Sequence, residues 1–203
     1  SESLKMFSNC PIVGDILNSD DDEKINNLYK MLNKIIDERK ILFSDYNGDY
    51  YTYCKNTGKK IPIIVVVINN YESYQETYSQ FDETLIVLTR ECNRYGIFFV
   101  LTVNTPNGLR FKLRQNFSLI YVLQQNNDDD YTTILGNIHK NYPAKIFGRG
   151  IFKIDDVYEF QTALVYEKDN IIKYVKKKNE ELKNKYSSSA SSIPTLPKSI
   201  GYK

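Results

Sequence analysis

Ile63-Ile64-Val65-Val66-Val67-Ile68-Asn69-Asn70 is the stretch that decides the fold of this chain. Its first six residues are all β-branched and apolar, with no polar residue between them. A continuous run of this kind predicts a strand that is covered on both faces, as at the centre of a parallel sheet. Two amide side chains end the run. They are expected at the carboxyl edge of the sheet, where the functional groups of α/β proteins gather.

Outward from this strand, predicted helices and strands alternate along the chain. Apolar residues at helical spacing and capping signals predict helices at residues 23–43, 82–95, 131–138 and 169–186. Further apolar runs predict strands at residues 97–103, 119–123, 151–154 and 160–166. Residues 44–60 are expected to form a polar loop, because they contain two turn signals. The alternation predicts an α/β fold with a mostly parallel central sheet flanked by helices.

The composition limits the classes of function. The chain has 203 residues, of which 41% are hydrophobic, so it can bury one full core. A net charge of +2 is too mild to indicate a nucleic-acid partner. Three dispersed cysteines and one histidine provide no metal-ligand spacing, so we expect no metal site built from these residues.

The order of short motifs along the chain resembles the FtsK/SpoIIIE family of hexameric ATPases. More narrowly, it is similar to the last ATPase module of type VII secretion motors of the EssC/EccC kind. The segments that carry this resemblance, which spans residues 1–197, are 61–70, 90–97, 101–106, 130–136, 147–152, 160–163 and 193–197. The resemblance implies a RecA-like P-loop NTPase core over residues 1–168, a Lys-rich helix over 169–186, and a linker with a Pro-bracketed tail over 187–203.

In this resemblance the strand at residues 63–70 takes the place of the Walker B strand. That strand normally ends in an Asp that holds the Mg²⁺ shell and a Glu that orients the attacking water. Here Asn69 and Asn70 stand in those two places. An amide supplies no negative charge for Mg²⁺ and cannot act as a base, so we expect no catalytic residues at this degenerate site. Asn104 and Thr105 match the strand end that lies near the nucleotide in the family.

A Walker A loop, Gly-x-x-x-x-Gly-Lys-Ser/Thr, does not occur in the sequence. The sequence around Gly58-Lys59 lacks the first glycine and the Ser/Thr. The resemblance implies that the N-terminal Walker A portion of the core lies upstream of Ser1. We therefore expect no cofactor in this chain as given, and ATP with Mg²⁺ only if such a loop precedes it.

Two arginines are candidates for trans-acting residues that reach a neighbouring subunit's nucleotide, as in ring motors. They are Arg110 and Arg149. The alternative, that they are ordinary surface or loop arginines, is favoured on frequency alone.

The leading hypothesis for function is a non-hydrolysing module of a type VII secretion motor that contributes substrate docking or regulation. The resemblance implies partners: preceding ATPase domains of the same polypeptide, small helical-hairpin secretion substrates, and further copies in a homo-hexamer. It also implies a cytoplasmic domain of a cell-membrane-anchored protein, with no nucleic acid expected. Two alternatives stay open: an active ATPase whose Walker A lies upstream, and a DNA translocase module.

Overall fold

The computed structural model describes residues 2–164 and 170–195, which group by spatial contact into two compact units. One unit comprises Ser1–Lys59 with Tyr166–Lys203, and the other comprises Lys60–Val165. The predicted domain bounds at residues 168 and 186 follow the order of the chain rather than contacts in space, and they remain a prediction.

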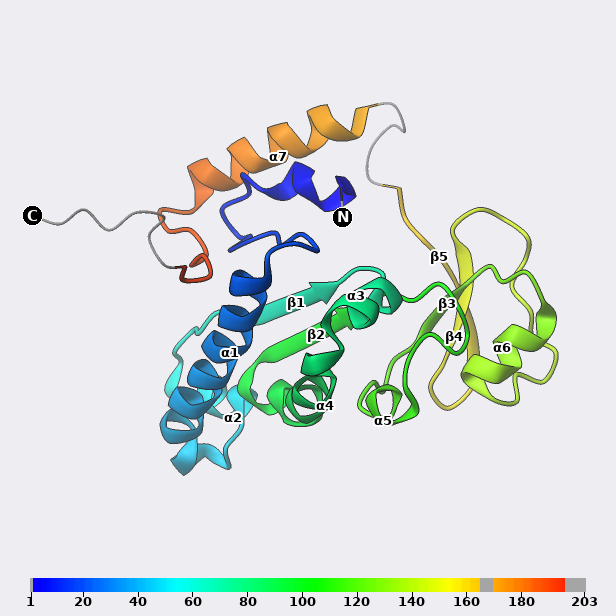
Figure 1. The fold of residues 1–203 in the computed structure, drawn as a ribbon, viewed down its shortest axis with the longest axis horizontal. Coiled ribbons are helices and arrows are strands. Elements are labelled where there is room, and N and C mark those ends of the chain that lie inside the picture. Colours follow the sequence, from blue (N-terminus) through cyan, green and yellow to red (C-terminus); the bar gives the residue numbers. More distant parts are fainter. Residues whose placement is uncertain (1, 165–169, 196–203) are drawn as a thin grey trace, which may run out of the picture. The chain divides into compact units, whose positions relative to one another are not determined.

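The two units contain different kinds of elements (Figure 1). The described helices of the first unit are η1 (Glu2–Phe7), α1 (Asp22–Leu42), η2 (Ser44–Tyr46), α2 (Tyr50–Thr57) and α7 (Ile171–Lys185). The elements of the second unit are β1 (Ile64–Ile68), α3 (Tyr71–Tyr78), η3 (Ser79–Phe81), α4 (Asp82–Glu91), η4 (Cys92–Tyr95), β2 (Ile97–Leu101), α5 (Phe111–Arg114), β3 (Tyr121–Leu123), α6 (Asp128–Leu135), β4 (Arg149–Lys153) and β5 (Val157–Gln161).

Strands β1 and β2 form a parallel pair, which confirms the parallel pairing expected for the strand at residues 63–70. Helices α3 and α4 cover one face of this pair, and that face carries Ile68 and its register partner Leu101 (Figure 1). Beneath them lies a fully buried cluster of Tyr71, Leu85 and Leu113. The helix-to-strand step before β2 is closed by Gly96, whose φ of 70° suits a glycine at a helix end.

The other face of the β1–β2 pair departs from the prediction of a strand covered on both faces. Val65 and Val67 are 52% and 50% exposed, and Val100, the register partner of Val67, is 47% exposed. The reason is that burial alternates along β1, with Ile64, Val66 and Ile68 on its more covered face. The apolar run predicted the strand correctly, but the prediction that both of its faces are buried was wrong. We call the exposed face, defined by Val65, Val67 and Val100, the valine face.

The remaining strands form a separate antiparallel sheet in the order β3-β4-β5. The α/β class is confirmed, while parallel pairing among the described ladders is confined to β1 and β2. One face of this second sheet packs against α6, with Val122, Tyr131, Ile138 and Ile151 at the centre of the contact (Figure 1).

In the first unit, α1 buries a stripe of side chains at helical spacing, formed by Ile25, Tyr29, Leu32 and Ile36. The helix begins and ends within a residue or so of the predicted bounds. No helix within residues 2–164 and 170–195 is long and apolar enough to cross a lipid bilayer.

The predicted loop at residues 44–60 is wrong, because helix α2 lies within it. The Asp49 carboxylate accepts a hydrogen bond from the Thr52 amide at 2.8 Å, as an N-cap does. Gly58 ends the helix with a φ of 69°. Tyr53 lies between these caps, and its ring packs on that of the fully buried Phe43, with the two ring centroids 4.9 Å apart. Tertiary packing of aromatic rings therefore stabilises a short helix that the turn signals obscured.

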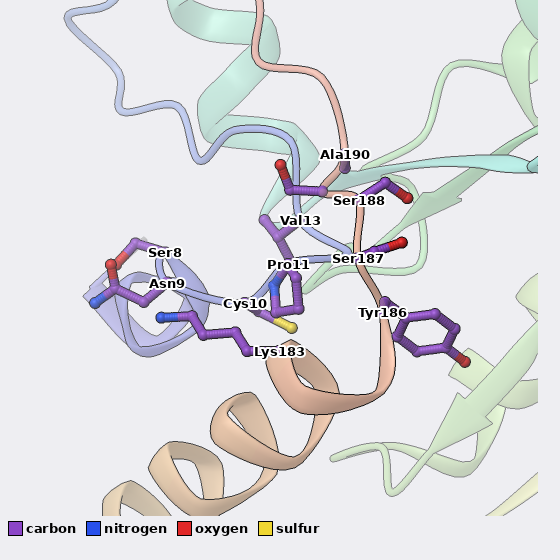
Figure 2. Close-up of a pocket in the computed structure, with 11 residues that line it drawn as sticks. Ser8, Asn9, Cys10, Pro11, Val13, Lys183, Tyr186, Ser187, Ser188 and Ala190 are labelled. Atoms are coloured by element: carbon purple, nitrogen blue, oxygen red, sulfur yellow. The ribbon is translucent and has the colours of Figure 1, made fainter.

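The segment after α7 returns to the N-terminal residues of the same unit. The Ala190 amide donates a hydrogen bond to the Pro11 carbonyl at 2.7 Å, and Figure 2 shows both residues at one pocket. Gly14 permits this approach, because a Cβ there would lie 2.4 Å from the Ser191 carbonyl oxygen. Ile193 is buried. The first part of the predicted Pro-bracketed tail is thus packed, while residues 196–197 lie outside the described residues.

Removing the contact between α1 and this tail should loosen the tail. The Asn27 side-chain amide donates to the Pro194 carbonyl at 2.8 Å. We expect Asn27→Ala to speed hydrogen exchange at the Ala190 amide by about fivefold, the effect of losing about 1 kcal/mol. The matched control is Asn26→Ala on the exposed side of the same helix, which should leave the rate unchanged. Equal rates in the two variants would show that this hydrogen bond does not hold the tail.

Candidate functional site

The carboxyl ends of β1 and β2 meet at one threonine. The Thr102 amide donates to the Ile68 carbonyl at 3.0 Å, and the Thr102 carbonyl accepts from the Tyr71 amide at 2.9 Å. The Thr102 hydroxyl accepts a hydrogen bond from the backbone N–H of Asn70 at 2.9 Å. It donates a hydrogen bond to the side-chain oxygen of Asn69 at 2.8 Å. Sequence reasoning did not single out Thr102, which lies within the strand predicted at residues 97–103 and directly follows the observed β2.

The structure brings three predicted site residues together at this edge: Asn69, Asn70 and Asn104. The Asn104 side-chain nitrogen donates to the Asn70 side-chain oxygen at 3.1 Å. Asn70 has a φ of 60°, a left-handed conformation that asparagine tolerates better than most residues, and it begins α3. The amide oxygens of Asn69 and Asn70 therefore each accept a hydrogen bond from within the protein.

A carboxylate that the sequence analysis missed lies beside these amides. Glu72 Oε1 accepts from the backbone amides of Asn104 and Thr105 at 2.8 and 3.0 Å, and from the Thr105 hydroxyl at 3.2 Å. Glu72 Oε2 accepts from the Asn104 amide at 3.1 Å. Its position two residues after the amide pair was the available signal, but sequence does not show which way an acid turns.

These contacts control the protonation of Glu72. Burial alone would raise the pKa of its carboxyl, but hydrogen bonds from Asn104 and Thr105 outweigh that effect and hold the pKa below its usual value. Because the folded-state pKa is lowered, the stability from this ionised carboxylate is present at neutral pH. It is lost as the pH falls through the lowered pKa. Glu72 is thus an anion at neutral pH, and its oxygens are committed to the loop.

The residues at this edge do not fit a Mg²⁺ ion. Mg²⁺ takes oxygen ligands, and carboxylates provide the charge that compensates its dehydration. The side-chain oxygens of Asn69 and Asn70 are neutral and already accept hydrogen bonds, and Glu72 turns to the 102–108 loop. Within residues 2–164 and 170–195, no group of three His, Cys, Asp or Glu side chains could hold a metal ion.

Arg110 is paired within its own unit. Its guanidinium lies 3.0 Å from Asp82 Oδ2, and Asp82 is 2% exposed at the start of α4. The same carboxylate accepts from the Tyr71 hydroxyl at 3.2 Å and the Gln75 side chain at 3.1 Å. Burial, together with the neighbouring Asp82 carboxylate, raises the pKa of the Tyr71 hydroxyl far above its usual value, so Tyr71 stays a donor. Arg110 therefore helps to satisfy a buried charge, and its predicted role towards another subunit stays a prediction.

Arg149 lies in the antiparallel sheet, at the first residue of β4. Its guanidinium lies 3.3 Å from the Glu159 carboxylate, and its Nε donates to the Gln161 side chain at 2.9 Å. Both partners belong to β5. These contacts are those of a strand-pairing arginine, and the trans-acting role proposed from the resemblance stays a prediction for this residue too.

Curated proteins and solved structures are similar to this chain in sequence and in fold. No protein-family model matches the chain. The type VII secretion system protein EssC of Staphylococcus aureus strain MRSA252 is 26% identical over 187 residues, which are 91% of this chain and 12% of that protein. The ESX secretion system protein EccC of Geobacillus thermodenitrificans is 26% identical over 203 residues, which are 97% of this chain and 14% of that protein.

The solved structures agree on the fold. ATPases 2 and 3 of EssC from Geobacillus thermodenitrificans superpose with a TM-score of 0.85 at 25% identity, over 98% of this chain and 39% of that one. The chain is a homologue of the EssC and EccC secretion ATPases. This result confirms the resemblance drawn from the motif order, and with it the α/β P-loop-like fold class.

A protein with the same fold and lower sequence identity was solved with a peptide. ATPases 2 and 3 of EccC from Thermomonospora curvata, in complex with a signal sequence peptide, superpose with a TM-score of 0.76 at 18% identity, over 96% of this chain and 37% of that one. At this identity the comparison establishes the fold alone. The present chain spans only 12% and 14% of the two curated relatives named above. The activities of those whole proteins therefore go beyond what this similarity shows.

Removal of the Asp82 carboxylate tests the buried pair. We expect Asp82→Ala to lower the free energy of unfolding by about 3 kcal/mol, because the Tyr71 hydroxyl is left buried without its acceptor. Arg110→Ala should cost less, about 1–2 kcal/mol, because solvent screens the half-exposed guanidinium and the buried Asp82 carboxylate keeps its Tyr71 and Gln75 donors. Urea unfolding measures both. Glu83→Ala, at the exposed neighbour of Asp82, is the control and should be neutral. A neutral Asp82→Ala would contradict the network.

Proposed function

We propose that this chain is a non-hydrolysing ATPase-fold module of a type VII secretion motor, which contributes substrate docking or control of the motor. The homology to EssC and EccC supports the assignment to a type VII secretion motor. One observation carries the loss of hydrolysis: Asn69 and Asn70 end the strand where the family places its two acids, and their side-chain oxygens are engaged by Thr102 and Asn104.

The chemistry explains why hydrolysis is not expected here. Phosphoryl transfer on this fold depends on a metal-bridged phosphate and a group that orients the attacking water. Asn70 is neutral and cannot accept a proton from that water. The nearby acid, Glu72, is held by the Asn104 and Thr105 amides. Asp82, the buried acid at the start of α4, is neutralised by Arg110. Neither acid replaces the missing pair.

A docking role is supported by a peptide complex of a protein with the same fold. The peptide-bound EccC structure shows that a homologous pair of ATPase domains forms a complex with a signal sequence peptide. We propose that the partners of this chain are the other ATPase domains of its motor and the signal segments of small secreted proteins, bound at the cytoplasmic face of the membrane.

Replacement of the amide pair separates a catalytic from a non-catalytic module. In the complete protein we expect Asn69→Ala with Asn70→Ala to leave ATP turnover within about twofold of wild type, since neither side chain reaches a transition state. Steady-state phosphate release measures this. The comparison variant, Asn69→Asp with Asn70→Glu, reinstates the acids. A fall of about tenfold or more in the alanine variant would show that the module hydrolyses ATP.

Titration with a labelled signal peptide tests docking. We expect the chain to bind the C-terminal signal segment of a cognate substrate saturably, because signal recognition is the function proposed to survive. Fluorescence anisotropy follows the binding. A scrambled peptide of the same composition is the control, and it should not saturate. Equal curves for both peptides, or no saturation with any cognate segment, would exclude the docking role and leave regulation.

A further inference from the structure

The loop that follows β2 surrounds a carboxylate with donors. The backbone amides of Asn104 and Thr105 and the Thr105 hydroxyl all lie within 3.2 Å of Glu72 oxygens. Successive amides that point into one hollow form a concave site for anions, and they bind phosphate or carboxylate groups in many proteins. The Asn104 and Thr105 amides lie just beyond the carboxyl end of β2, at the edge of a parallel strand pair where α/β proteins bind their ligands.

The shape of the loop depends on a glycine opposite the donors. A Cβ at Gly108 would lie 2.2 Å from Glu72 Oε1 and 2.9 Å from the Thr105 hydroxyl oxygen. The Gly108 amide also donates to the Thr105 carbonyl at 3.1 Å, which closes the turn. The loop therefore folds around an oxyanion only because this position has no side chain.

We propose that the 102–108 loop is an oxyanion-binding site that Glu72 fills from within the chain, so that a phosphate or carboxylate group of a ligand binds there only by displacing the Glu72 side chain. The proposal goes beyond the proposed secretion role and holds whether or not the module docks a substrate. It assigns a ligand chemistry to Asn104 and Thr105 that needs no divalent cation, since the donors are amides and a hydroxyl.

An internal carboxylate competes strongly with an external one. Tethering gives Glu72 an effective concentration in the millimolar range or above, and no translational freedom is lost when it binds. An external anion at lower concentration therefore leaves Glu72 in place. The loop is thereby kept in one arrangement regardless of the surrounding solutes, until a ligand with further contacts displaces the side chain.

The test uses inorganic phosphate as the probe and the amide signals of Asn104 and Thr105 as the readout. In the full 203-residue chain, phosphate is titrated at constant ionic strength while heteronuclear NMR follows the two amides. Wild type should show no saturable shift up to about 20 mM, the range set by the tethered competitor. Glu72→Ala should show a saturable shift at both amides, with an affinity at least about tenfold higher.

Two further variants separate an occupied site from a purely structural hydrogen-bonded turn. Glu76→Ala removes an exposed carboxylate from the same helix and should behave as wild type. Glu72→Gln removes the negative charge of the internal competitor and keeps a side chain of the same size, so it should also gain phosphate binding. This variant keeps the proposal testable if Glu72→Ala does not fold.

The outcomes are distinct. Gain of binding by Glu72→Ala or Glu72→Gln, at the Asn104 and Thr105 backbone amides, supports the proposal. A parallel titration with acetate distinguishes a general oxyanion site, which gains both ligands, from a phosphate-selective one. Absence of any gain in both variants overturns the proposal, and so does phosphate binding by wild type as tight as by the variants. None of these results depends on signal-peptide binding or on ATP turnover.

Discussion

The hydroxyl group of Thr102 holds the carboxyl ends of β1 and β2 in register, and the arrangement of the candidate site depends on it. The hydroxyl accepts a hydrogen bond from the backbone N–H of Asn70 and donates one to the side-chain oxygen of Asn69. It therefore fixes both residues at the end of β1. The left-handed backbone of Asn70 then turns the chain into α3. That turn places Glu72 against the loop after β2. One side chain of three heavy atoms thus links a parallel strand pair to the first helix that covers it.

A second constraint is that the negative charges of the acidic side chains need partners within the fold. Glu72 and Asp82 lie in the same unit as the amide pair, and each carboxylate is satisfied internally, Glu72 by backbone amides and Asp82 by Arg110. An active phosphoryl-transfer site does the opposite, because it leaves its acids facing a metal ion and a water molecule. In this structure both carboxylates are therefore placed where they stabilise the fold.

The sequence predicted the parts of this fold that carry long patterns. The apolar runs of β1 and β2, the stripe of α1 and the glycine that ends η4 were all legible, because burial and backbone conformation restrict residue type there. Helix α2 was missed because packing on Phe43 stabilises it. The strand end at Asn69 and Asn70 was placed correctly. The inward turn of Glu72 was not predictable, since residue type does not fix which donors an acid meets.

The valine face has a consequence for the life of the protein in a crowded cell. Val65 and Val67 of β1 and Val100 of β2 form a β-branched, uncharged patch that is about half exposed, on two strands whose described ladder involves each other alone. Such surfaces adhere to one another and to other incompletely folded chains. Chaperones bind the same kind of surface during synthesis. The solubility of the protein, and the time it survives before degradation, therefore depend on how soon another surface covers this face.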